Sequence, residues 1–239
     1  MTALSVNLNK VALLRNSRGR NYPDLVKVAL DCQQMGADGI TIHPRPDERH
    51  ARKSDIPALK EAISVELNVE GYPHEELLQV VEKHKPAQFT MVPDPPGALT
   101  SDSGWDTITH ASFLKEVIDR MHEAGIRCSI FIGTEPKFIE AAVATGTDRI
   151  ELYTEPYAAH YSLDAREKVV APFADAAKLA HDLGLKINAG HDLNLDNLAY
   201  FAEKVPHLDE VSIGHALVTD ALYLGLQETI TRYQKCLGK

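Results

Sequence analysis

The feature that most constrains the fold of this chain is a regular alternation of short strand-like runs and amphipathic stretches. Eight runs with two-residue periodicity or continuous apolar character are each followed by a stretch with 3.6-residue periodicity. The expected strands are Leu4–Asn9, Gly39–His43, Glu66–Glu70, Gln88–Val92, Cys128–Ile132, Arg149–Tyr153, Lys186–Gly190 and Glu210–Gly214. The expected helices are Pro23–Met35, Ile56–Ser64, Glu75–Lys83, His110–Glu123, Pro136–Ala144, Asp164–Leu183, Asn194–Lys204 and Ala216–Cys236.

Short returns between these units favour a closed barrel over an open doubly wound sheet. Gly36, Gly125 and Gly184 each stand where a helix ends and the next strand begins, as helix C-termini prefer. The length of 239 residues matches one barrel, and no change of composition marks a domain boundary. We therefore expect an α/β protein, a single (β/α)8 TIM barrel over residues 1–239 with extra short helices.

Strand parity predicts an unusually polar barrel interior. One face of each strand carries apolar side chains such as Leu4, Val6 and Ile40, which must meet the surrounding helices. The opposite face then lines the barrel axis, where Val, Ile and Leu are usual. Here it carries Ser5, Asn7, Asn9, Thr41, His43, Glu66, Asn68, Glu70, Arg149, Glu151, Asn188 and Ser212. Because buried polar groups need partners, we expect a hydrated, hydrogen-bonded interior that continues into the site.

Charge and composition exclude several classes of protein. With 25 basic and 34 acidic residues the net charge is −9, which argues against a nucleic-acid or anionic-membrane partner. The N-terminus lacks the features of a signal peptide, and no run of about 18 apolar residues predicts a transmembrane helix. Cys32, Cys128 and Cys236 form no CxxC motif, which indicates reduced cysteines and a cytoplasmic protein.

Two long connections follow expected strands on the side where barrel enzymes bind substrate. Residues 94–107 are rich in Pro, Gly, Ser, Thr and Asp, and residues 155–163 are rich in aromatic side chains. We interpret both as substrate or lid loops, with simple connectors as the alternative. No P-loop, GxGxxG or GxSxG motif is present, and no His or Asp spacing matches a zinc site. We expect no metal and no cofactor.

Ionisable side chains gather where separate strands end. His43, Glu70, Glu151, His191 and His215 come from five different strands or the residues that follow them. Because the carboxyl ends of parallel strands meet at one face of a barrel, we expect these groups to converge at its mouth. Carboxylates and imidazoles held together suit serial proton transfers.

Two places in the sequence indicate phosphate binding. Arg45, after the second strand, and Arg18, from the first loop, are a candidate clamp because guanidinium groups bind phosphate in a bidentate fashion. At the eighth strand Gly214 and His215 lead directly into a helix, whose first N–H groups attract anions.

These residues lie in motifs that resemble the pyridoxine 5′-phosphate synthase family, and the resemblance spans the whole chain in order. Its carriers are NLNKVALLRNSRG at 7–19, GADGITIHPR at 36–45 with His50, LNVE at 67–70, VP at 92–93 with Thr100, IE at 150–151, LKINAGH at 185–191 and IGHA at 213–216. The family condenses 1-deoxy-D-xylulose 5-phosphate with 3-amino-2-oxopropyl phosphate, releasing phosphate and water. The resemblance thus implies a transferase of vitamin B6 biosynthesis that assembles from dimers into a homo-octamer.

The resemblance also implies residue roles. His43 and Glu70 would accept protons, and His191 would donate one. The implied substrate-binding residues are Arg45, His50 and Thr100 for the deoxyxylulose phosphate, Asn7, Arg18, Gly214 and His215 for the amino-ketone phosphate, and Asn9, Lys10, Glu151 and Asp192 around them.

Three positions depart from the family pattern. The chain has Asn7-Leu-Asn9-Lys10 where the family has Asn-x-Asp-His, and Asp192 and Glu155 replace glycines. Two other functions remain open: a barrel aldolase or isomerase acting on another sugar phosphate, and a non-catalytic barrel that binds phosphometabolites. A Schiff-base aldolase would need a lysine at a strand end, whereas Lys186 stands at a strand start.

Overall fold

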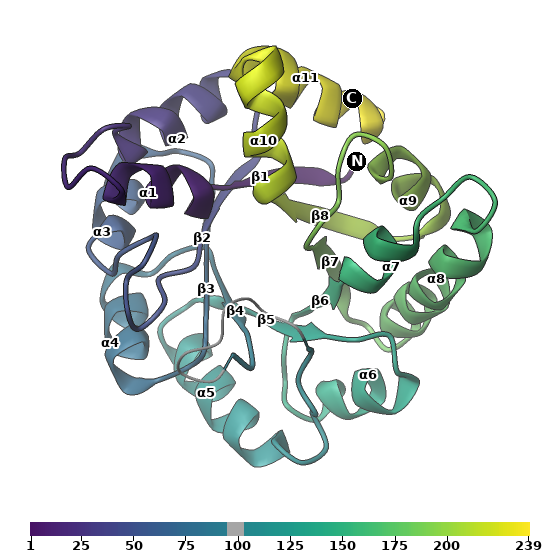
Figure 1. The fold of residues 1–239 in the computed structure, drawn as a ribbon. Coiled ribbons are helices and arrows are strands. Elements are labelled where there is room, and N and C mark those ends of the chain that lie inside the picture. The colour runs from purple at the N-terminus through teal and green to yellow at the C-terminus, as the bar shows by residue number, and fades with distance from the viewer. Residues whose placement is uncertain (95–102) are drawn as a thin grey trace.

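The computed structural model describes residues 1–94 and 103–239 as a closed barrel of eight parallel strands in chain order (Figure 1). Each strand pairs with its neighbours in sequence, and the first pairs with the last. The predicted (β/α)8 barrel is confirmed. The strands are β1 (Ala3–Asn7), β2 (Gly39–Ile42), β3 (Glu66–Gly71), β4 (Gln88–Met91), β5 (Arg127–Ile132), β6 (Arg149–Tyr153), β7 (Lys186–Gly190) and β8 (Leu208–Ile213).

Helices surround the ring of strands, and additional ones lie over its open end (Figure 1). The surrounding helices are α2 (Leu25–Gln34), α3 (Asp55–Ala62), α4 (Glu75–His84), α5 (Ala111–Glu123), α6 (Pro136–Val143), α8 (Arg166–Asp182), α9 (Leu198–Lys204) and α11 (Leu226–Cys236). The additional helices are α1 (Asn9–Asn16), α7 (Glu155–His160) and α10 (His215–Leu224), so the prediction of extra short helices is confirmed. Within the described part of the chain, none of the helices combines the length and apolar character needed to cross a bilayer.

Three predicted boundaries are wrong for local reasons. The first strand ends at Asn7 because the Asn7 side-chain oxygen accepts a hydrogen bond from Asn9 N–H at 3.0 Å and turns the chain into α1. The aromatic connection after β6 contains the short helix α7 instead of a loop. The last predicted helix is divided by Gly225, whose φ of 78° no helix accommodates.

The core lies between the strands and the helices, as the apolar parity predicts. Leu4, Val6 and Ile40 on that face are all buried. The polar side chains on the opposite strand face fill the barrel axis, so the predicted polar interior is also confirmed. There Ser5 and Thr41 hydroxyls lie 2.7 Å apart, and Thr90 donates to the Asn68 side-chain oxygen at 3.0 Å. A ladder of small polar side chains therefore replaces the aliphatic layers of an ordinary barrel.

Candidate active site

His43 and Glu70 form the centre of the mouth. His43 follows β2 and Glu70 lies near the end of β3, with His43 Nδ1 and Glu70 Oε2 4.0 Å apart. Both side chains are buried. Asn7 donates to Glu70 Oε2 at 3.5 Å and Ser212 donates to Glu70 Oε1 at 3.4 Å. Side chains from β1, from β8 and from the residue after β2 thus surround the Glu70 carboxyl group of β3.

Burial sets the proton affinity of this pair. Burial and the nearby Glu210 carboxylate raise the pKa of Glu70 to about 8. Burial, together with the charge of Arg45, holds the pKa of His43 well below its usual value. The raised pKa allows Glu70 to gain or lose a proton near neutral pH, and the lowered pKa keeps His43 in its neutral, proton-accepting form.

His191 reaches the mouth from the end of β7. Its ring makes edge contacts with Phe131 and Tyr153, with centroids 4.9 and 5.6 Å away. Burial lowers its pKa, and its buried Nδ1 has no hydrogen-bond partner among the described residues. A neutral imidazole with an unsatisfied nitrogen is a group prepared to meet a substrate.

The backbone at His191 explains one departure from the family pattern. His191 has a φ of 84° and the following Asp192 a φ of 58°, both in the left-handed region. Glycine is favoured there, and Asp is among the few other residues that adopt it. The Asp192 side chain is exposed, so its carboxylate lies in solvent.

Glu151 completes the acidic part of the site. It is buried, and its Oε2 has no partner among the described residues. Burial, followed by the charges of Glu70 and Glu210, raises its pKa well above the usual value. A Cβ on Gly190 would lie 2.6 Å from Glu151 Oε1, so this position has no room for a side chain. Glycine at 190 therefore makes space for the carboxyl group.

A cationic rim borders the same mouth. Arg45 is buried and pairs with Asp94 at 2.6 Å. His50 lies next to His43, with ring centroids 6.2 Å apart, and its Nδ1 accepts from Ala51 N–H at 2.9 Å. Burial and the charge of Arg45 lower the pKa of His50 to about 4, and Lys10 and Arg49 act in the same direction. Arg45 and Lys10 thus bring positive charges to this rim, while the lowered pKa leaves His50 neutral near pH 7, and a phosphate site needs such cationic groups.

Residues of α1 hold this rim in place, and the sequence did not reveal their role. The buried Arg15 pairs with Asp55 at 2.7 Å and donates to the His50 carbonyl at 3.2 Å. The Asn16 amide donates to the carbonyls of residues 48, 49 and 50. Both residues lie in the first family-like motif, yet their partners are more than 30 positions away in the chain. Helix α1 therefore fixes the loop that carries Arg45 and His50.

The remaining predicted residues lie around this centre. The Asn9 side-chain oxygen accepts from His43 N–H at 2.8 Å, so Asn9 fixes the His43 backbone. Lys10 is exposed in the first turn of α1, and Arg18 is exposed in the turn after it, without a hydrogen bond or ion pair to the described residues of the mouth. The expected Arg18–Arg45 phosphate clamp therefore stays a prediction. Thr100 lies outside the described residues.

Helix α10 supplies the second predicted anion site. It begins at His215 directly after Gly214, and its first N–H groups have no partners within the helix. A Cβ on Gly214 would lie 3.0 Å from Asn7 Cβ, so the glycine lets β8 and β1 approach. His215 is exposed at this helix start.

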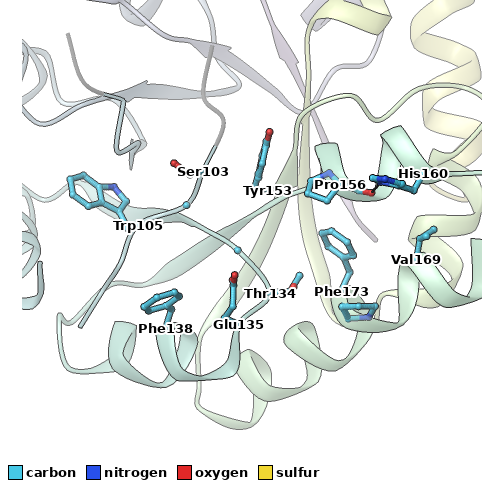
Figure 2. A pocket seen from close by; sticks show the side chains of 13 residues that line it. Ser103, Trp105, Thr134, Glu135, Phe138, Tyr153, Pro156, His160, Val169 and Phe173 are labelled. Atoms are coloured by element: carbon cyan, nitrogen blue, oxygen red, sulfur yellow. Dashed lines mark hydrogen bonds between the residues drawn. The ribbon is translucent and has the colours of Figure 1, made fainter. Parts of the chain in front are cut away.

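A cavity of about 610 Å³ lies beside the mouth (Figure 2). Trp105, Phe138 and Phe173 form much of its wall, with Glu135 at its edge. Tyr153 belongs to this wall and also contacts His191. The cavity is therefore separated from the catalytic candidates by one aromatic side chain.

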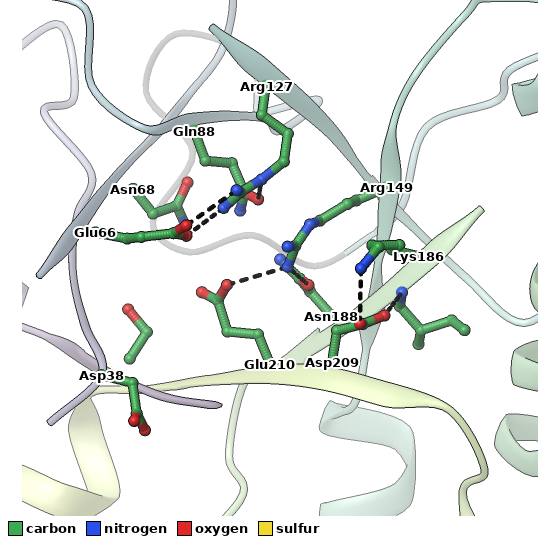
Figure 3. Close-up of polar contacts among 12 residues, drawn as sticks. Asp38, Glu66, Asn68, Gln88, Arg127, Arg149, Lys186, Asn188, Asp209 and Glu210 are labelled. Atoms are coloured by element: carbon green, nitrogen blue, oxygen red, sulfur yellow. Dashed lines mark hydrogen bonds and ion pairs between the residues drawn. The ribbon is translucent and has the colours of Figure 1, made fainter. Parts of the chain in front are cut away.

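The opposite end of the axis, here called the floor, is closed by ion pairs (Figure 3). Arg127 pairs with Glu66 and donates to Gln88 at 2.9 Å. Arg149 donates to Asn188 at 2.9 Å and lies 3.4 Å from Glu210. Lys186 also belongs to this end, where it pairs with Asp209 at 3.5 Å. The lysine that a Schiff-base aldolase would need is thus placed far from the mouth.

One group at the floor end has metal-ligating side chains. Among the described residues, ligand atoms of His122, Cys128 and Asp148 lie within 4.8 Å of one another. Asp148 accepts from Cys128 N–H at 2.7 Å and from His122 at 2.8 Å. Asp38 and Asp209 make the same contact with the N–H of the second residue of β1 and of β7, and each pairs with a lysine. Asp148 is thus one of three aspartates that bind a backbone N–H near the start of a strand, and this structural role accounts for the group.

Solved structures with similar folds include an isomerase and a synthase. The phosphoribosyl anthranilate isomerase from Thermotoga maritima superposes with a TM-score of 0.62 at 13% identity, covering 100% of this chain and 99% of that one. A tryptophan synthase structure from M. tuberculosis gives a TM-score of 0.63 at 15% identity, covering 99% and 93%. At this identity the similarity establishes the barrel fold alone.

Sequence relatives are much closer. Pyridoxine 5′-phosphate synthase from Parabacteroides distasonis is 59% identical over 238 residues, covering 100% of both chains. The enzymes of the same name from Porphyromonas gingivalis and Cytophaga hutchinsonii are 58% and 54% identical, again over 100% of both chains. The family model described as pyridoxal phosphate biosynthesis protein PdxJ matches residues 4–239. The chain therefore belongs to the PdxJ family.

Proposed function

We propose that this chain is a pyridoxine 5′-phosphate synthase that joins 1-deoxy-D-xylulose 5-phosphate and 3-amino-2-oxopropyl phosphate into the pyridine ring. The observation that carries the proposal is the meeting of His43, Glu70 and His191 at the mouth of a barrel of the PdxJ family. Relatives that match over their full length bear the name of this enzyme. A protein that only binds phosphometabolites would have no use for three acid–base groups with shifted pKa values at one mouth.

The reaction needs proton transfers more than a protein nucleophile. The amino-ketone supplies the amine for imine formation, so no enzyme lysine is required. Imine formation removes a proton from nitrogen, and a later elimination removes one from carbon; in either case a proton donor assists the leaving oxygen. A pKa of about 8 lets Glu70 exchange protons near neutral pH, with His43 beside it as second acceptor. His191, which directly follows β7 and lies across the mouth from β3, is the proposed donor.

Two anion sites are proposed to hold the two phosphates. The cationic rim of Arg45, His50 and Lys10 would bind the deoxyxylulose phosphate, with the phosphate replacing Asp94 as partner of Arg45. The start of α10 at Gly214 and His215 would bind the phosphate of the amino-ketone, next to Asn7. Glu151 and Asn9 would orient the reacting atoms between them, and Asp192 and Arg18 would border the second site.

The test is a synthase assay on purified protein with both substrates and no added metal, following pyridoxine 5′-phosphate by absorbance and phosphate release in parallel. We expect product from the unaltered chain and a loss of at least ~100-fold in kcat for His191→Asn. His181→Asn is the matched control, because His181 is exposed in the last turn of α8 at the floor end. Folded protein that binds each substrate but forms no product would overturn the proposal and favour another sugar-phosphate reaction.

We also propose that the chain works in the cytoplasm as a homo-octamer built from dimers. Large apolar side chains stay exposed on the additional helices and in the connection after α1, among them Leu14, Tyr22, Leu222 and Tyr223. Such side chains support burial against further copies. Sedimentation equilibrium tests the assembly: a mass of about eight chains is expected, and a monomer at micromolar concentration would contradict it.

A further inference from the structure

The turn that carries His191 is held in an uncommon backbone conformation by side chains from outside it. His191 and Asp192 are consecutive non-glycine residues with φ of 84° and 58°. Residues in this region persist where surrounding contacts fix them. The contacts that fix the turn therefore also decide where the His191 ring points.

Thr154 makes the most direct of these contacts. It follows β6 and stands at the N-cap of α7, yet its hydroxyl makes no capping hydrogen bond to that helix. Instead Thr154 Oγ1 lies 2.6 Å from the carbonyl oxygens of both Gly190 and His191, which share its single proton. Its N–H also donates to the Gly190 carbonyl at 3.1 Å. A completely buried hydroxyl is thus diverted from helix capping to the two peptide groups on either side of the His191 Cα.

Asn197 supports the same turn from the other side. Its side-chain amide donates to the Asp192 carbonyl at 3.2 Å, and its oxygen accepts from Asn194 N–H at 2.9 Å. The buried Tyr157 of α7 donates to the Asn197 carbonyl at 2.8 Å. Helix α7 and the residue before it therefore clamp the His191 turn from two directions.

We propose that Thr154 is a positioning residue for proton donation by His191: its hydroxyl fixes the peptide groups flanking His191 so that the imidazole stands between Phe131 and Tyr153 and faces the mouth. This inference rests on the proposed function of His191. Thr154 itself touches no reacting atom, so its effect passes through the orientation of the ring.

The experiment compares Thr154→Val, which keeps the shape and removes the hydroxyl, with Thr154→Ser, which keeps the hydroxyl. Thr145→Val is the matched control, because Thr145 is equally buried and donates to a carbonyl, that of Ala142, at 2.6 Å in the turn before β6. For Thr154→Val we expect kcat to fall roughly 10- to 100-fold with KM changed less than about threefold, and the acidic limb of the pH–rate profile to shift. Thr154→Ser is expected to restore kcat to within about threefold of the unaltered chain.

Crystal structures of the two Val variants provide a readout independent of activity. In Thr154→Val the His191 ring is expected to rotate or the turn to leave the left-handed region, whereas Thr145→Val leaves both unchanged. An unmoved ring, or a kcat for Thr154→Val equal to that of Thr145→Val, would overturn the inference. If the unaltered chain makes no pyridoxine 5′-phosphate, the proposed function fails, and the ring position alone then decides whether Thr154 orients His191.

Discussion

Glutamate side chains at the two ends of the barrel axis have pKa values that are shifted in opposite directions. At the floor Glu66 accepts hydrogen bonds from Arg127, and this contact lowers its pKa. Further along the axis Glu210 has only a 3.4 Å contact with Arg149, and burial raises its pKa to about 7. At the mouth Glu70 receives only amide and hydroxyl donors, and its pKa rises to about 8. The affinity of these carboxyl groups for protons therefore increases from the exposed Glu66 to the buried Glu210 and Glu70, first because burial disfavours the charged form and second because arginine partners become fewer.

This gradient shows how one polar interior serves two purposes. Ion pairs at the floor pair Arg127 with Glu66 and Arg149 with Glu210, whereas the Glu70 carboxyl group at the mouth has no arginine partner among the described residues. Buried atoms without a hydrogen-bond partner occur at both ends: Glu151 Oε2 and His191 Nδ1 at the mouth, and Arg149 Nε and Asn188 Nδ2 at the floor. Such groups cost stability, which the rest of the fold must offset, and at the mouth a bound substrate can supply the missing partners.

The largest expected effect is on kcat, and it compares two glutamates at opposite ends of the same strand. Glu70 and Glu66 lie on the same face of β3, at the mouth and the floor respectively. Glu70→Gln removes the proposed base, so kcat should fall roughly 10²- to 10⁴-fold in the synthase assay. Glu66→Gln, the control, should leave kcat nearly unchanged. Equal losses in both variants would show that the ends are not functionally distinct.

The pH dependence of stability tests the gradient directly. The pKa values of Glu70 and Glu210 are about 8 and 7 in the folded chain, above the ordinary value near 4.5. The lowered pKa values of His43, His50 and His191 act in the opposite direction below the ordinary histidine value of about 6.5. Above about pH 7 these histidines are neutral in both states, whereas the folded state keeps carboxyl protons that the unfolded chain has released, so the free energy of unfolding should decrease as pH rises from about 7 to about 8. Each unit of pKa difference corresponds to about 1.4 kcal/mol.

Urea denaturation at several pH values measures this slope. Glu70→Gln should flatten it, because the variant has no proton to lose in that range. Glu66→Gln should leave it unchanged, since the lowered pKa of Glu66 affects stability only as pH falls below the ordinary value near 4.5. A stability that increases between pH 7 and 8 would contradict the raised pKa values.

An intermediate effect, on the free energy of unfolding, is expected from removing an ion pair at the floor. Arg149→Met removes the partner of both Asn188 and Glu210 and leaves a buried carboxyl group unpaired, so the free energy of unfolding should drop by about 3 kcal/mol at pH 8. Lys115→Met is the control, because the Lys115–Asp119 pair is exposed on α5 and should contribute little. Activity per folded molecule should survive in Arg149→Met. A matching loss of kcat would mean that the floor takes part in catalysis.

The smallest effect concerns the departure at Asp192. Replacing it by glycine suits a φ of 58° and removes a carboxylate beside the proposed phosphate site. We expect stability to change by less than about 1 kcal/mol and KM for the amino-ketone phosphate to decrease a fewfold. A higher KM in steady-state kinetics would instead show that the Asp192 side chain helps to bind this substrate.

The sequence by itself determined the barrel and its polar axis. Alternating periodicities require β-α units, and the side-chain period of a strand decides which residues meet the helices and which meet the axis. For this reason His43, Glu70 and Glu151 could be placed at one mouth from their positions in three strands. The family-like motifs named the same residues, and the comparisons agree on the family.

Only the tertiary structure decided which partners these groups have. Ser212 reaches Glu70 across 142 positions, Arg45 meets Asp94 across 49, and Thr154 meets His191 across 37. The start of α1 depends on the hydrogen bond from Asn9 N–H to the Asn7 side-chain oxygen, and the alternating strand pattern gives no sign of it. Burial and charge at short range set the pKa values, and both fall off over distances that the sequence does not encode. The chain thus specifies which groups enter the site, and packing between distant segments specifies their protonation and orientation.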